Sequence, residues 1–127
     1  MDFESYTPSL GAPAAFVAAS IFKDGRRVGV VALQIPLDRI DAVMTGDRKW
    51  EEYGLGRTGE TYLVGSDFRM RSDSRFFLED EKKYLESLAG RGVPADLIRL
   101  MQAHHSTVLF QQITTPAAKA ALARRHG

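Results

Sequence analysis

The fold is decided by Gly54-Leu55-Gly56-Arg57-Thr58-Gly59-Glu60-Thr61-Tyr62-Leu63-Val64-Gly65-Ser66-Asp67-Phe68-Arg69-Met70-Arg71-Ser72-Asp73-Ser74-Arg75. Three glycines open this stretch, and residues 60–64 follow as a strand-like run. On a strand, side chains alternate between the two faces, so Tyr62 and Val64 share one face while Thr61 and Leu63 share the other.

A turn is predicted at residues 65–67, because glycine tolerates a positive φ and an aspartate can accept a hydrogen bond from the backbone two residues on. Residues 68–72 then run back as a second strand. The stretch therefore predicts a β-hairpin entered through a glycine loop, with Gly59 and Asp67 as structural turn residues.

The same glycines, Gly54, Gly56 and Gly59, match the G-x-G-x-x-G pattern of dinucleotide-binding proteins. That pattern binds a pyrophosphate only when a strand precedes it and a helix follows it. Here residues 49–53 are a poor buried strand, and a strand is predicted after the last glycine. A turn-forming loop is therefore the favoured interpretation, and a small intracellular nucleotide-binding enzyme that uses the Gly54–Gly59 loop is the alternative.

Size and composition exclude several classes of protein. The chain has 127 residues, 44% hydrophobic and 26% charged, which indicates a globular domain or parts of two small ones. A net charge of +1 gives no general case for nucleic-acid binding, and the basic cluster at residues 124–126 is expected to be a solvated end. Cysteine is absent, which removes disulfides, zinc–thiolate sites and cysteine nucleophiles.

A second hairpin is predicted upstream, from residues 14–22 and 27–35. Asp24 and Gly25 stand between the two runs as structural turn residues, and Asp-Gly is a strong short-range signal for a tight hairpin. Residues 27–35 are apolar on both faces, which favours a central strand. Residues 1–13 contain two prolines and a glycine and are expected to form an irregular arm.

Helices are predicted between and after the hairpins. Pro36 suits the start of a helix that ends near residues 45–47, and further helices are expected over 79–89, from Pro94, and over 117–125. Residues 107–113 are predicted as a strand. Because hairpins dominate, the predicted class is α+β with a mostly antiparallel sheet and flanking helices.

No catalytic group of residues is evident, and neither a metal nor a cofactor is predicted. His104 and His105 are adjacent, so on a helix they point about 100° apart and cannot face one metal ion. On a strand, Arg69, Arg71, Asp73 and Arg75 would share one face. We expect an exposed, self-compensating charged face there, with an anion contact or a subunit contact as the functional alternative.

The motif at 54–75 resembles the start of the membrane-proximal module of double Cache (PAS-like) sensors, through its Gly54–Asp67 portion and the Met70–Arg75 run. Residues 14–22 and 28–38 are similar to the hairpin that closes the membrane-distal module of that family, and residues 111–122 are similar to a strand and helix of the proximal module. The resemblance implies a PAS/Cache-like fold, with residues 1–45 ending the distal module and residues 46–127 beginning the proximal one.

The function implied by this resemblance is ligand sensing on the periplasmic or extracellular face of the inner membrane. Family members are membrane-anchored receptors that pass small-molecule binding to a cytoplasmic chemotaxis, kinase or cyclase output domain. This chain is therefore expected to be an internal piece of one, and a homodimer is slightly favoured. By the same resemblance, the candidate ligand-binding residues are Tyr6, Phe16, Ala18 and Ser20. The aromatic–Arg–Trp-Tyr run of amino-acid-binding members is not visible, so the ligand is not identified.

Overall fold

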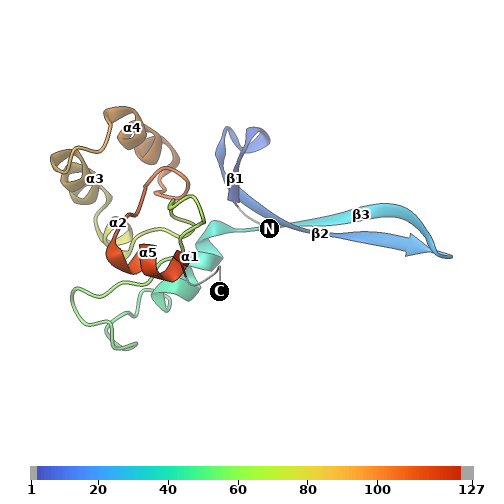
Figure 1. The fold of residues 1–127 in the computed structure, drawn as a ribbon, viewed down its shortest axis with the longest axis horizontal. Coiled ribbons are helices and arrows are strands. Elements are labelled where there is room, and N and C mark those ends of the chain that lie inside the picture. The colour runs from blue at the N-terminus through green and yellow to red at the C-terminus, as the bar shows by residue number, and fades with distance from the viewer. Residues whose placement is uncertain (1–2, 124–127) are drawn as a thin grey trace.

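The computed structural model describes residues 3–123, which form an α+β fold. Figure 1 shows a cluster of helices and loops from which one long hairpin projects. In the described part of the chain, the sheet has three antiparallel strands in the order β1-β2-β3, namely β1 (Phe3–Tyr6), β2 (Ala12–Lys23) and β3 (Arg26–Ile35). The basic cluster predicted at 124–126 lies outside the described residues.

The hairpin of β2 and β3 turns at Asp24 and Gly25. Their φ angles are 49° and 76°, so both residues are left-handed, as a two-residue type I′ turn requires. The strands pair from Lys23 with Arg26 at the turn to Ala15 with Ile35 at the base, with one shift in register beside Ile21.

Two predictions for this sheet are wrong. Residues 3–6 are not part of an irregular arm but form β1, because Phe3 is buried and pairs with Ala15 of β2. The central strand is β2, whereas β3 lies at an edge. The outer half of the hairpin is exposed on both faces, with Ile21 at 46% and Val30 at 56%, so its apolar character does not reflect burial within the described chain.

The predicted central hairpin is also absent as regular structure. Among the described residues, the 60–72 region pairs only through isolated bridges, Val64 with Met70 and Arg69 with Gln112, and residues 107–113 form no strand. Phe68 and Leu109 have φ angles of 62° and 67°, and these left-handed residues interrupt an extended backbone. The backbone hydrogen bonds of these bridges include donation from the Arg71 amide to the Leu63 carbonyl at 2.8 Å and from the Met70 amide to the Gln111 carbonyl at 3.0 Å.

Within residues 3–123, five α-helices surround these loops: α1 (Leu37–Thr45), α2 (Arg75–Glu79), α3 (Glu81–Gly90), α4 (Ala95–His104) and α5 (Pro116–Ala123). Helix α1 follows Pro36 and ends at Gly46, whose φ of 57° is typical of a helix C-cap. Asp80 caps α3 by accepting a hydrogen bond from the Lys83 amide at 3.0 Å. The sequence predicts a strand over 68–72 and a helix only from residue 79, so the short helix α2 is an element that it does not predict.

Two apolar clusters hold the body together. Phe77, Leu85, Leu88 and Met101 join α2, α3 and α4. The second cluster contains Phe3, Ala15 and Val108, and it therefore packs the base of the sheet against the loop that follows α4.

The Asp24-Gly25 turn can be tested with a matched pair of glycine variants. Neither Gly25 nor Gly90 has an atom within 4 Å of an added Cβ, but only Gly25 has a positive φ. Gly25→Ala should therefore destabilise the hairpin by about 1 kcal/mol, whereas Gly90→Ala should be neutral or slightly stabilising. Amide hydrogen exchange of β2 and β3 measures the difference, and equal protection in both variants would contradict the turn.

Candidate ligand cavity

The Met70–Arg75 run is buried, so the prediction of an exposed charged face is wrong. Ser72 and Ser74 are fully buried, and Asp73 and Arg75 are 3% and 4% exposed. Burial of so many polar groups is tolerated only when each has internal partners. Those partners determine how the surrounding segments are placed.

Asp73 is the most heavily bonded of these residues. Its Oδ1 accepts hydrogen bonds from Ser106 Oγ at 3.0 Å, from Thr107 Oγ1 at 2.7 Å and from the Thr107 amide at 2.5 Å. Its own amide donates to Oδ1 of Asp41 at 2.7 Å. Asp73 therefore connects the loop after α4 to helix α1.

The Asp41 carboxyl group is buried beside Asp73. Burial disfavours its charged form, and the charge of Asp73 disfavours it further, so the pKa of Asp41 is raised to about 7. A protonated Asp41 places no second negative charge against Asp73, and α1 can pack closely on the Met70–Arg75 run.

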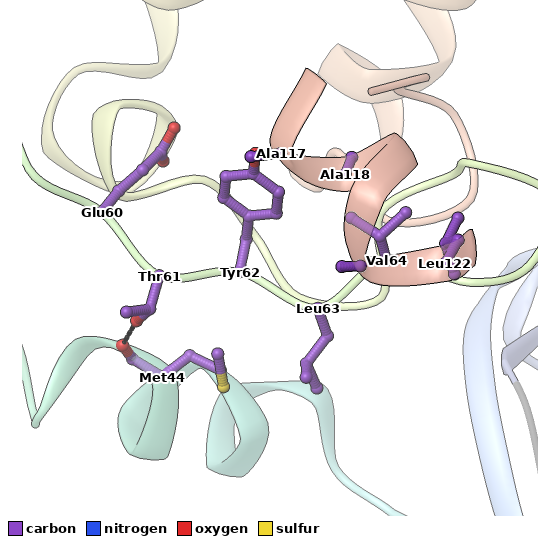
Figure 2. Close-up of a pocket in the computed structure, with 10 residues that line it drawn as sticks. Met44, Glu60, Thr61, Tyr62, Leu63, Val64, Ala117, Ala118 and Leu122 are labelled. Carbon is purple, nitrogen blue, oxygen red and sulfur yellow. Dashed lines mark hydrogen bonds between the residues drawn. The ribbon is translucent and has the colours of Figure 1, made fainter. Parts of the chain in front are cut away.

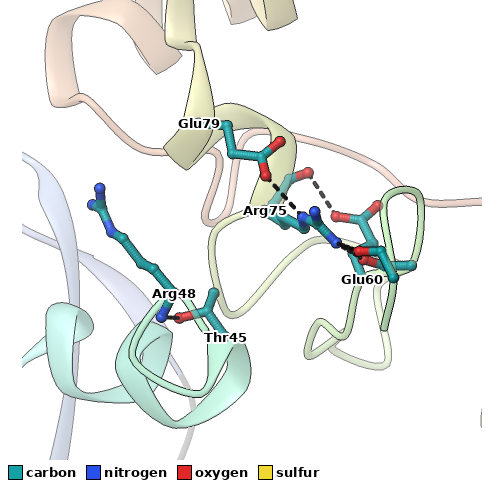
Figure 3. Close-up of polar contacts among 8 residues, drawn as sticks. Thr45, Arg48, Glu60, Arg75 and Glu79 are labelled. Carbon is teal, nitrogen blue, oxygen red and sulfur yellow. Dashed lines mark hydrogen bonds and ion pairs between the residues drawn. The ribbon is translucent and has the colours of Figure 1, made fainter. Parts of the chain in front are cut away.

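Arg75 organises the glycine loop, as Figure 3 shows. Its Nη1 donates to the carbonyls of Gly56 and Gly59 at 2.8 and 2.7 Å, and its Nε donates to Glu79 at 2.9 Å. The guanidinium also lies 4.6 Å from the centre of the Trp50 ring. Two carbonyls of the loop therefore point at the Arg75 guanidinium. The segment that follows Gly59 is not helical.

Two buried serines hold that non-helical segment, residues 60–64. Ser74 Oγ donates to Oε2 of Glu60 at 2.8 Å, and Ser72 Oγ accepts from the Leu63 amide at 2.9 Å. On the opposite side, Thr61 Oγ1 donates to the carbonyl of Met44 in α1. The segment is therefore fixed between the Met70–Arg75 run and α1.

A cavity of about 590 Å³ lies between this segment, α1 and α5, which is within the size range of small-molecule sites. Figure 2 shows Tyr62 and Val64 directed toward α5, and Thr61 and Leu63 directed toward α1. The alternation that the sequence predicts for residues 60–64 is thus present without a regular strand. The lining is mostly apolar and is completed by residues from the two helices: Met44, Ala117, Ala118, Ala121 and Leu122.

The predicted ligand-binding residues do not line this cavity. Tyr6 and Phe16 lie together, with ring centres 5.0 Å apart in an edge-to-face arrangement. Ala18 and Ser20 are exposed farther along the projecting hairpin. The pattern that points to the cavity is the alternation at residues 60–64, but nothing local in the sequence indicates that α5 packs opposite it.

Asp67 lies in the turn for which it was predicted. Its Oδ1 accepts from the Arg69 amide at 3.0 Å and lies 3.1 Å from Arg71 Nη2. Partial burial acts to raise the pKa of Asp67, but these hydrogen bonds outweigh it, and the pKa is lowered.

The adjacent histidines have separate partners. His105 Nδ1 lies 3.0 Å from Glu81 Oε2, and His104 stacks on Phe110 with ring centres 5.3 Å apart. Within residues 3–123, no group of three or more histidine, aspartate or glutamate side chains is placed to hold a metal ion.

Comparisons with protein-family models, with curated proteins and with solved structures return no match for this chain. Among the helices of the described chain, none has the length and apolar character needed to cross a membrane.

The hydrogen bonds to Asp73 should contribute more to the free energy of unfolding than those to Asp67. Asp73→Ala leaves buried donors of Ser106 and Thr107 without an acceptor, and we expect a loss of about 3 kcal/mol or more. Asp67→Ala, at a side chain that is 45% exposed, should cost about 1 kcal/mol. Urea denaturation followed by circular dichroism measures both, and equal losses would contradict the central role of Asp73.

The protonation of Asp41 predicts a pH dependence. The folded chain keeps this proton up to about pH 7, whereas the unfolded chain releases it near 3.8, so the folded state binds more protons between these values. The contribution of Asp41 to the free energy of unfolding therefore falls as the pH rises through this window, by up to about 1.4 kcal/mol per unit.

Asp41→Asn removes this titration and keeps an acceptor for the Asp73 amide. Relative to the parent chain, the variant should gain stability steadily between about pH 4 and pH 7. Asp96→Asn, at an exposed position of α4, is the control. Denaturant unfolding at a series of pH values makes the measurement, and a pH-independent difference between Asp41→Asn and the parent would refute the assignment.

Proposed function

We propose that this chain is a ligand-sensing region of a bacterial membrane receptor with a PAS/Cache-like fold, and that it lies on the extracytoplasmic side of the membrane. Binding of a small molecule would pass to a cytoplasmic output domain of the chemotaxis, kinase or cyclase type. The observation that carries this proposal is the cavity between residues 60–64, α1 and α5. Its apolar lining with few polar groups is typical of a binding site for a small organic molecule.

The position of the cavity also suits signalling. Its walls belong to two helices, α1 and α5, that the 60–64 segment separates. A ligand that contacts both helices favours one packing of them over another, and the populations of the two packings shift by the difference in affinity. Sensing needs no catalytic residue in this scheme.

The resemblance adds support. The residues that carry it include the Met70–Arg75 run, and these same residues fix the glycine loop and the 60–64 segment. The alternative, an intracellular nucleotide-binding enzyme, has less support, because two carbonyls of the Gly54–Gly59 loop accept hydrogen bonds from Arg75 and no helix follows it.

The cavity can be tested by filling it. Ala121 lines the cavity, whereas its neighbour Ala120 is exposed on α5 and does not. Ala121→Trp should abolish binding of small molecules to the cavity, and Ala120→Trp should leave it intact. Binding is measured as amide chemical-shift changes at residues 60–64 and 117–122 with a panel of amines, acids, alcohols, amino acids and nucleotides.

Two results would count against the proposal. One is the absence of shift changes at the cavity with every compound of the panel. The other is an Ala121→Trp chain that binds as tightly as the parent, because the ligand would then lie elsewhere. Nucleotide binding that maps to the glycine loop would favour the enzyme alternative.

A further inference from the structure

Charge is distributed unevenly around the cavity. Of the described residues that line it, Glu60 is the one charged side chain, and none of them is an arginine, lysine or histidine. An anionic ligand would meet a carboxylate there and no balancing cation, whereas a cationic ligand would meet its complement. The negative charge of the described lining therefore favours cationic ligands over anionic ones.

The carboxylate of Glu60 has capacity to bind a ligand. Its Oε2 accepts one hydrogen bond, from Ser74 Oγ, and within residues 3–123 it forms no ion pair. Arg57, the nearest cation along the chain, is exposed, and Arg75 uses its guanidinium on Glu79 and on two loop carbonyls. An ionised carboxylate offers about four acceptor sites, so Glu60 keeps acceptor positions for a donor that enters the cavity.

Tyr62 supplies a second polar group on the same side of the segment. Figure 2 shows the Glu60 and Tyr62 side chains leaving the segment in the same direction, with the Tyr62 ring beside Ala117 of α5. The Tyr62 hydroxyl makes no hydrogen bond to any described residue. Beyond these two groups the lining is apolar, with Val64, Ala118 and Leu122 on the α5 side.

We propose that the cavity binds a small primary amine with an apolar body, whose ammonium group donates hydrogen bonds to Glu60 and Tyr62 while its body contacts the apolar wall. This assignment rests on the proposed sensing function and names its ligand class. Free amino acids are poor ligands by the same reasoning, because their carboxylate would enter a site whose described lining residues include no cation.

The test compares three probes of equal length and different charge: hexylamine, hexanol and hexanoate. At pH 7 we expect hexylamine to shift the amide resonances of residues 60–64 and 117–122, and to bind at least about tenfold more tightly than hexanol. Hexanoate should give no shifts at these positions. Added salt should weaken hexylamine binding and leave hexanol binding unchanged.

The matched variants are Glu60→Gln and Glu52→Gln. Glutamine at position 60 keeps an acceptor for Ser74 and loses the charge, so hexylamine should bind about tenfold more weakly while hexanol binds as before. Glu52 is exposed and outside the cavity, so its variant should match the parent. Tyr62→Phe, which keeps the ring in place, should weaken hexylamine binding to a smaller extent.

The outcomes separate the ligand class from the sensing function. Binding of hexanoate as tight as that of hexylamine, an unchanged hexylamine affinity in Glu60→Gln, or hexylamine shifts confined to the projecting hairpin would each overturn the amine assignment. If other compounds of the panel still bind in the cavity, the sensing proposal survives that failure. If no compound binds there, both proposals are overturned.

Discussion

The hydrogen bonding of the buried Asp73 carboxylate is the interaction on which the rest of the structure depends. A carboxylate leaves water only at high cost unless donors replace its hydration. Here three donors from residues 106 and 107 converge on one oxygen, and the Asp73 amide bonds Asp41 of α1. These bonds join segments more than 30 residues apart in the chain, which explains how a body with little regular sheet keeps a defined arrangement.

The same run of residues extends this order to the cavity. Ser72 and Ser74 hold the 60–64 segment, and Arg75 holds the loop that precedes it. Asp41 lies one helical turn before Met44, which lines the cavity and accepts a hydrogen bond from Thr61. The burial of Asp73 and the shape of the cavity are therefore linked, because both depend on the position of α1. A ligand that moved α1 would act directly on the Asp41–Asp73 contact.

The parts of the fold that could be predicted are those determined by neighbouring residues. The Asp24-Gly25 turn and the end of α1 at Gly46 need only a local left-handed backbone. The strands predicted at 60–64, 68–72 and 107–113 are reduced to single bridges, and the amides of Leu63 and Thr107 bond the side chains of Ser72 and Asp73 instead of a neighbouring strand. No local pattern indicates those partners.

The candidate site likewise has one part that neighbouring residues determine and one part that depends on residues far away in the chain. The alternation of residues 60–64 correctly separates Tyr62 and Val64 from Thr61 and Leu63, since it depends only on neighbouring backbone. The opposite wall, formed by α5, comes from more than 50 residues farther along the chain. Apolar alanines in a helix fit a core face as well as a cavity wall, so composition alone cannot distinguish the two.

The outer part of the projecting hairpin is ordered although it packs against no apolar core. Its turn and its cross-strand hydrogen bonds set the register of β2 and β3. The side chains on its exposed faces are not buried, so burial does not favour one register over another. The edge of β3 and both apolar faces remain open to further strands, and surfaces of this kind are where other chains or segments add. In the proposed receptor, this makes the hairpin the natural surface for additional strands or a second subunit. The compact body, which Asp73 and its partners hold together, keeps the ligand cavity apart from that surface.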